Sequence, residues 1–210
     1  MNIDYSHANL EIQSRHFFIR EELEHARFAR FFSADPRLPF SIAYPQHLEP
    51  LYDDTEYLNI LRVTFGKGIF GVIRLDMTQA MEPEDLSQIA SPIPLSMSPR
   101  IKTLLETIKN WGPMSHTFQT QQLWQAEMQE KLITVSEPGF QASHVVWKAG
   151  NGRSGEWVVF QFRSNLWTIF RNSIVPFSSD DFNTILSSFR FLDDAFFQAL
   201  GVRWGERSKT

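Results

Sequence analysis

The chain has 210 residues, 42% of them hydrophobic and 14% aromatic, which is enough apolar side chain for one domain with a sizeable core. Its net charge of −4 disfavours a nucleic-acid-binding protein, because phosphate contacts need a concentrated excess of Lys and Arg. The lack of cysteine excludes disulfides, thiolate metal sites and thiol nucleophiles.

The N-terminal sequence MNIDYSHANLEIQSRHFF shows neither the basic start nor the apolar run of a secretory signal. No window approaches the ~18 apolar residues that a membrane span requires. We therefore expect a cytoplasmic protein without a membrane span.

The first expected element is a helix that follows Ser14. The segment RHFFIREELEHARFARFF mixes apolar residues with charges of both signs at irregular helical spacing. Pro36 and Pro39 then stop it, because proline cannot continue a helical ladder. We expect residues 1–38 to form a helical extension and residues 39–210 to form one domain.

Strand patterns begin at residue 39. FSIAYP reads as a short strand and EPLYDDTEY as a loop, and two apolar segments flank the turn Gly66-Lys67-Gly68 as a hairpin. Pairing Phe65 with Ile69 would divide the hairpin into two faces. One face would carry Leu61, Val63, Phe65, Ile69, Ile73 and Leu75, and the other Ile60, Arg62, Thr64, Val72, Arg74 and Asp76.

The middle of the chain is expected to be irregular and then helical. QAMEPEDLSQIASPIPLSMS contains three prolines and no steady period, so we expect a long connection. Ser98 and Pro99 are typical of a helix start, and apolar residues follow at helical spacing up to Trp111. SHTFQTQQLWQAEMQEKL is helical by composition, with a strand at its start as the alternative.

Three strand patterns, FQASHVVWK, EWVVFQFR and LWTIFRN, predict an antiparallel meander. A turn at Ser164-Asn165 places one set of side chains on each face. One set is Val158, Phe160, Phe162, Trp167 and Ile169, and the other is Trp157, Val159, Gln161, Arg163, Thr168 and Phe170. Because both faces are largely apolar, we expect helices to cover the sheet on both sides.

A final helix is expected after Ser178, which is a good N-cap residue. Asp180 and Asp181 favour the positive end of the helix, and apolar residues recur at helical spacing up to Phe189. The predicted fold class is therefore α+β, a mostly antiparallel sheet flanked by helices on both faces, with an extra N-terminal helix.

This order of elements resembles the PsbP-like α/β/α sandwich superfamily over residues 39–192. The family's C-terminal helix ends in Ser-Phe followed by an apolar residue, which Ser188, Phe189 and Phe191 match. Members include photosystem II extrinsic subunits, a Ran-binding nuclear import factor and bacterial lipoproteins or chaperones, so the resemblance implies an accessory or binding role. The chain departs from the family in its N-terminal helix and in lacking an export signal, and no partner site can be transferred.

No catalytic signature is apparent. The histidines at 7, 16, 25, 47, 116 and 144 lack the spacing that fixes two metal ligands on one element, and His144 alone lies within a strand pattern that merits inspection. The acidic groups around Asp53 and Glu82 lack the ligand spacing of a calcium loop. We expect no metal, no cofactor and no enzymatic activity, although residues of a catalytic triad can be distant in sequence.

The leading hypothesis is an accessory or adaptor protein that binds another protein through its N-terminal helix or a partly open sheet face. The candidate residues are Trp157, Gln161, Arg163, Phe17, Phe28 and Trp204, because Trp and Arg dominate interface hot spots and the phenylalanines line the expected helix. In the alternative reading of the sheet face, a helix covers it and Arg163 only reaches solvent. A small-ligand or lipid-binding module with an apolar cavity, and a homo-oligomer, are further options.

Overall fold

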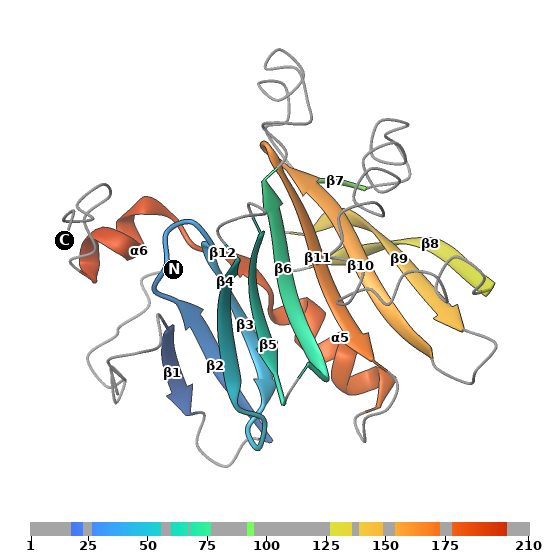
Figure 1. Ribbon diagram of the computed structural model, residues 1–210, viewed down its shortest axis with the longest axis horizontal. Coiled ribbons are helices and arrows are strands. Elements are labelled where there is room, and N and C mark those ends of the chain that lie inside the picture. Colours follow the sequence, from blue (N-terminus) through green and yellow to red (C-terminus); the bar gives the residue numbers. More distant parts are fainter. Residues whose placement is uncertain are drawn as a thin grey trace.

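The structure is a computed structural model that describes residues 18–22, 27–55, 60–66, 68–76, 92–94, 127–135, 139–148, 154–172 and 178–200. The described strands form a four-stranded sheet and an eight-stranded sheet (Figure 1). Every strand pairing among the described residues is antiparallel. The chain is therefore built mainly from two antiparallel sheets.

The smaller sheet uses both ends of the described chain. It contains, in spatial order, β1 (Phe18–Glu22), β2 (Phe28–Ser33), β3 (Phe40–Pro45) and β12 (Arg190–Phe191). Because β12 pairs with β3, a segment near the C-terminal end of the described chain is joined to the first part of the fold.

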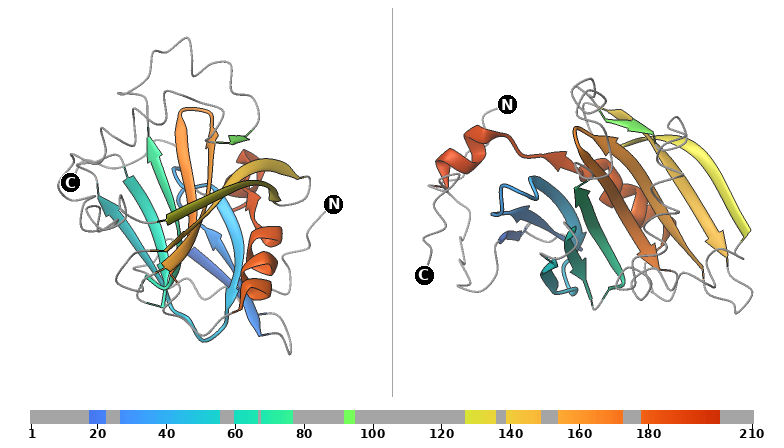
Figure 2. Two further views of the ribbon diagram at one scale, coloured as in Figure 1. Left: turned by 90° about the vertical axis from the view of Figure 1, so that its right-hand side faces the viewer. Right: turned by 45° about the horizontal axis from the view of Figure 1, so that its top comes forward.

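The larger sheet contains the hairpin and the meander. Its order is β4 (Pro50–Thr55), β5 (Ile60–Phe65), β6 (Phe70–Asp76), β11 (Asn165–Asn172), β10 (Ser154–Phe162), β9 (Phe140–Lys148) and β8 (Glu127–Val135), with β7 (Ile93–Pro94) beside β10. Strands β4 and β8 therefore form the two edges, and Figure 2 shows β8 at the end farthest from the smaller sheet.

Two short helices are described, α5 (Ser179–Ser188) and α6 (Asp194–Ala199). Helix α5 lies beside β3 and behind β10 and β11 in Figure 1. The Ser188 hydroxyl accepts a hydrogen bond of 2.7 Å from the Ala43 amide, which fixes the end of α5 to β3. Helix α5 thus continues the layer of the smaller sheet over the larger one.

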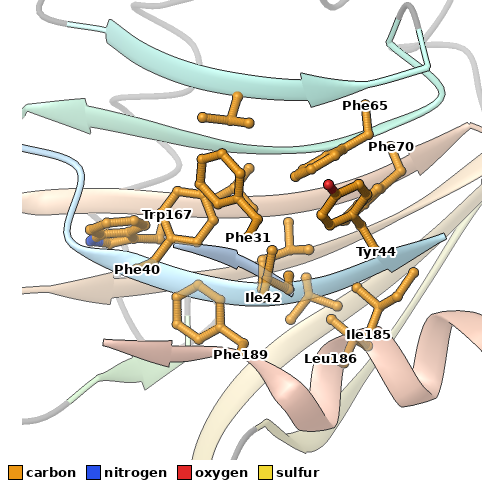
Figure 3. Packing of buried hydrophobic residues seen from close by; sticks show 14 of the residues in the cluster. Phe31, Phe40, Ile42, Tyr44, Phe65, Phe70, Trp167, Ile185, Leu186 and Phe189 are labelled. Atoms are coloured by element: carbon orange, nitrogen blue, oxygen red, sulfur yellow. The ribbon is translucent and has the colours of Figure 1, made fainter. Parts of the chain in front are cut away.

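The core fills the space between the larger sheet and the layer of the smaller sheet and α5 (Figure 3). Aromatic rings of the two layers are in contact: Tyr44 and Phe65 have centroids 4.7 Å apart, and Phe31 and Phe65 have centroids 5.6 Å apart. Such ring pairs add about 0.5–1.5 kcal/mol each to the burial of their surface. The high Phe content is thus largely used to join the two layers.

The prediction of helices on both faces of the sheet is wrong. In the described part of the chain one layer is a second sheet, and α5, the longer of the two short helices, extends that layer. The apolar character of both faces indicated that both are covered, but it could not indicate whether helices or strands cover them. The expected helix at residues 99–110 lies outside the described residues.

The predicted N-terminal helix is also wrong where the structure describes it, because residues 18–22 and 28–33 are the paired strands β1 and β2. Strand β2 is buried on both faces. Phe31 packs into the main core, whereas its neighbour Phe32 packs with Phe196 of α6. Successive residues of β2 are thus buried on opposite faces of the strand, and this burial outweighs the helical propensity of the charged residues in the segment. The division at residue 38 stays a prediction.

Two further segments differ from expectation. Residues 127–132, predicted as helix, belong to β8, and residues 50–55, predicted as loop, form β4. Each strand pairs along its whole length with a neighbour that the sequence did predict as a strand. Pairing with the next strand along the chain, rather than the local preference of the segment itself, determines both.

The hairpin exists, but its predicted register is wrong. Phe65 pairs with Phe70 instead of Ile69, so four residues form the turn, with Gly66 and Gly68 at φ values of 58° and 87°. A shift of one residue exchanges the faces of β6. Val72 and Arg74 therefore point to the core, while Ile73 and Leu75, which are also buried, lie on the opposite face with Arg62 and Thr64.

Three predictions are confirmed. FSIAYP forms β3, the meander of β9, β10 and β11 has the predicted faces, and α5 begins at a capping box formed by Ser178 and Asp181. The two-residue turn of the meander is Arg163-Ser164, one position earlier than expected. Phe196 and Phe197 fold back onto Phe32.

Candidate functional site

The mixed face predicted on β10 is mostly closed. Gln161 and Thr168 are 1% and 7% exposed, whereas Trp157 is half-buried and Arg163 is exposed. Trp157 lies within β10 and Arg163 in the turn after it, six residues of extended chain or about 20 Å away, so the structure does not bring them together. Arg163 lies in the turn at a positive φ of 53°, with its guanidinium 5.1 Å from the Phe162 ring.

The remaining candidate residues do not form a common surface in the described part of the chain. Phe28 is half-buried in β2 and packs against the core. Phe17 and Trp204 lie outside the described residues. A role of these residues in protein binding stays a prediction.

A different surface stands out at the β8 edge of the larger sheet. Strand β8 pairs with β9 in one unbroken register of nine residue pairs, without a bulge. Residues 129–132 and 134 are exposed, so both faces of the strand reach solvent, and Leu132 is 49% exposed. Among the described residues β8 pairs with β9 alone. Within the described part of the chain, this long edge of the sheet is therefore unpaired on its outer side.

The β4 edge is shorter and held to the rest of the molecule. It begins at Pro50, a residue type that limits strand pairing at edges. The Tyr52 hydroxyl donates a hydrogen bond of 2.5 Å to the buried carboxylate of Asp35. Leu51, on the opposite face, is 55% exposed.

A polar cluster lies next to β8 on the core-facing side of the sheet. Glu156 of β10 binds His144 of β9 and Arg171 of β11 with its two carboxylate oxygens, and His144 Nε2 lies 2.9 Å from Glu156 Oε2. Because a carboxylate only accepts hydrogen bonds, Nε2 is the donor. Lys131 of β8 lies opposite His144 in the register.

Burial holds His144 in its neutral form. Desolvation lowers the pKa of His144 below its ordinary value of 6.5, and the positive charges of Lys131 and Arg171 act in the same direction. The charge of Glu156 does not reverse this, because Arg171 already balances it. His144 Nδ1 is buried and has no hydrogen-bond partner among the described residues.

The cluster continues to the start of α5. Arg171 lies over the Phe182 ring at 5.3 Å and contacts the Ser179 hydroxyl at 3.3 Å. Asp181 accepts a hydrogen bond from the Ser178 amide, which is the largest influence lowering its pKa. These contacts connect three strands of the larger sheet to α5.

A second polar cluster lies at the other end of the same face. Arg37 binds the Asp35 carboxylate through both Nε and Nη2, and Arg74 donates to the Arg37 carbonyl at 2.5 Å and to Asn165 at 2.7 Å. Burial raises the pKa of Asp35, but hydrogen bonds from Arg37 and Tyr52 outweigh it and leave the pKa below 3.8. This cluster joins the loop after β2 to the larger sheet.

Neither cluster has the composition of a reactive centre in the part of the chain that the structure describes. The atom of His144 that could take a proton is buried, and no nucleophile is shown beside it.

No group of three or more metal-ligating side chains is found among the described residues. Within them, no helix has the length and apolarity needed to cross a membrane.

The sequence contained a signal for the β8 edge. Leu132, Ile133, Thr134 and Val135 form a strand-favouring run, and Pro138-Gly139 then marks a turn before β9. The Gln- and Glu-rich residues before this run favoured a helix. His144 was singled out correctly as the histidine to inspect, but its partners are distant in sequence.

No known family model and no curated protein matches the chain. Among solved structures, it is similar to the solution structure of cyanobacterial PsbP (CyanoP) from Synechocystis sp. PCC 6803. The identity is 13% and the TM-score 0.43, over 79% of this chain and 93% of that chain.

Proposed function

We propose that the chain is a non-enzymatic accessory protein that binds another protein by accepting an extended segment along β8. The observation that carries this proposal is the open edge of the larger sheet. Nine residues in unbroken register offer about 30 Å of strand, and four consecutive residues, 129–132, are exposed.

An edge strand leaves half of its backbone N–H and C=O groups unpaired within the sheet. A segment that adds as a further strand pairs these groups and obtains specificity from side chains on both faces. Proteins usually protect long edges with proline, bulges or a covering element. The β8 sequence EMQEKLITV contains no proline, and its register contains no bulge.

Other routes to binding have less support. The N-terminal helix was expected as one route, but residues 18–22 and 28–33 are strands. Gln161 of the expected sheet-face route is buried. Aromatic rings in contact occupy the space between the layers, which gives an apolar ligand cavity no support. Self-association stays a prediction.

Photo-crosslinking at two matched positions tests the proposal. A photoreactive side chain replaces Leu132 on β8 in one variant and Leu51 on β4 in the other, since the two residues are 49% and 55% exposed. We expect an adduct with a partner protein at position 132 and none at position 51. The partner is then purified, and its binding should slow hydrogen exchange at residues 127–135.

Two outcomes would contradict docking at β8. One is an adduct of equal yield at both positions, since this would reflect general stickiness of exposed leucines. The other is binding of the purified partner without added protection of the β8 amides. In that case the partner would contact another surface.

A further inference from the structure

We propose that the segment accepted by β8 runs antiparallel to it and carries an apolar, an acidic and a basic residue in consecutive positions, in that order from its N-terminus. The acidic residue would face Lys131 and the basic residue would face Glu130. Because this pattern rests on the proposed docking at β8, it specifies which extended segments that edge prefers.

The direction follows from the sheet itself. Every pairing described in the larger sheet is antiparallel, including β8 with β9. An added antiparallel strand continues the same geometry, whereas a parallel one would introduce a slanted and slightly weaker hydrogen-bond pattern.

The charges on β8 are available to a partner. Glu130 and Lys131 are both exposed, and neither forms an ion pair with another described residue. On the face of Lys131, the only carboxylate of the neighbouring cluster belongs to Glu156, which is bound to Arg171 and His144. Lys131 can therefore pair with an incoming acidic residue.

The order of the residues follows from strand geometry. Glu130, Lys131 and Leu132 are consecutive, so their side chains alternate between faces, and an antiparallel segment meets them in reverse order. It places its apolar residue opposite Leu132, then its acidic residue opposite Lys131, then its basic residue opposite Glu130. Opposite charges at directly facing positions stabilise a strand pair, and like charges destabilise it.

Two synthetic peptides test this pattern on the full chain. Both are strand-forming and contain one central apolar residue, which is followed by Glu-Lys in the first peptide and by Lys-Glu in the second. We expect the first to bind about fivefold more tightly at low salt, measured by fluorescence anisotropy. The doubly substituted variant Glu130→Lys, Lys131→Glu should reverse the preference, and circular dichroism checks that it is folded.

Equal affinity of the two peptides would overturn the charge pattern while leaving a crosslink at position 132 in place. A preference that the doubly substituted variant does not reverse would also overturn it, since the charges would then be read elsewhere. Failure of both peptides to bind at about 1 mM would overturn it too. Absence of the crosslink at position 132, by contrast, would contradict docking at β8 itself.

Discussion

The two edges of the larger sheet are built differently. Strand β4 has six residues, starts at a proline and is anchored through Tyr52 to the buried Asp35. Strand β8 has nine residues, no proline and solvent on both faces over residues 129–132. The comparison indicates that one edge belongs to the framework of the fold and the other is available for pairing.

The polar clusters reinforce this difference. Asp35 and its arginines attach the β4 side to the loop after β2, whereas Glu156 joins β9, β10 and β11 one strand inside the open edge. The interior strands next to β8 are thus connected by charged contacts, while β8 itself is held through its pairing with β9. An edge strand that pairs with a stably held neighbour and has an unpaired outer side is suited to accept another strand.

The largest effect is expected at the anchored edge. Asp35→Asn removes the charge that Arg37 and Tyr52 bind in a 5% exposed position, and should cost about 2–4 kcal/mol in the free energy of unfolding. Urea denaturation measures this, with the exposed Asp194→Asn as the matched control. If Asp35→Asn accelerated hydrogen exchange more at β8 than at β4, relative to the wild type, this would contradict the assignment of the cluster to the β4 side.

A smaller effect is expected near the open edge. Glu156→Gln leaves Arg171 without its charged partner and weakens the His144 hydrogen bond, so we expect a loss of about 1–3 kcal/mol. The same substitution at exposed Glu130 should change stability by less than about 0.5 kcal/mol. If the two variants were equally stable in urea, the contacts of Glu156 would be of no consequence for the fold.

Stability should also depend on pH through His144. Since its folded pKa lies below the ordinary 6.5, the unfolded chain binds the proton more readily, and stability falls as the pH drops below 6.5 toward the folded pKa. Thermal melts from pH 8 to 5 should show a smaller decline for His144→Gln than for the wild type. The same substitution at exposed His47 should retain the wild-type decline.

The smallest effect on stability is expected for Leu132→Lys and Leu51→Lys, each within about 0.5 kcal/mol, because both leucines are about half exposed. Their effects on binding should differ. A new charge on β8 should weaken the partner found by crosslinking at least about tenfold, which is about 1.4 kcal/mol. The substitution on β4 should leave the dissociation constant unchanged, and equal weakening by both would remove the distinction between the edges.

Prediction from the sequence succeeded where local signals were strong. The N-cap Ser178, the apolar stripe of α5 and the alternation of the meander each depend on residues close in the chain. Prediction failed where strand pairing or burial overrode the local preference of a segment. Residues 28–33 read as helix because nothing nearby shows that Phe31 meets Phe65 on one face while Phe32 meets Phe196 on the other.

The candidate site follows the same division. The sequence singled out His144 and supplied the strand-favouring run that ends β8, but Trp157, Gln161 and Arg163 were grouped by alternation alone. The structure separates that group, since Gln161 is buried and Arg163 lies in a turn. Exposure depends on what covers a strand, and alternation carries no information on that.

The sequence by itself thus determined that the chain forms an antiparallel meander closed by a capped helix, because periodicity and capping are local properties. Only the tertiary structure decided that a second sheet forms the opposing layer, that the hairpin is shifted by one residue and that β8 is an open edge. These features depend on how strands pair, both between neighbouring strands, as in the hairpin, and between strands far apart in the chain, as in β12 with β3. Hydrogen bonding and burial across the whole fold select that pairing.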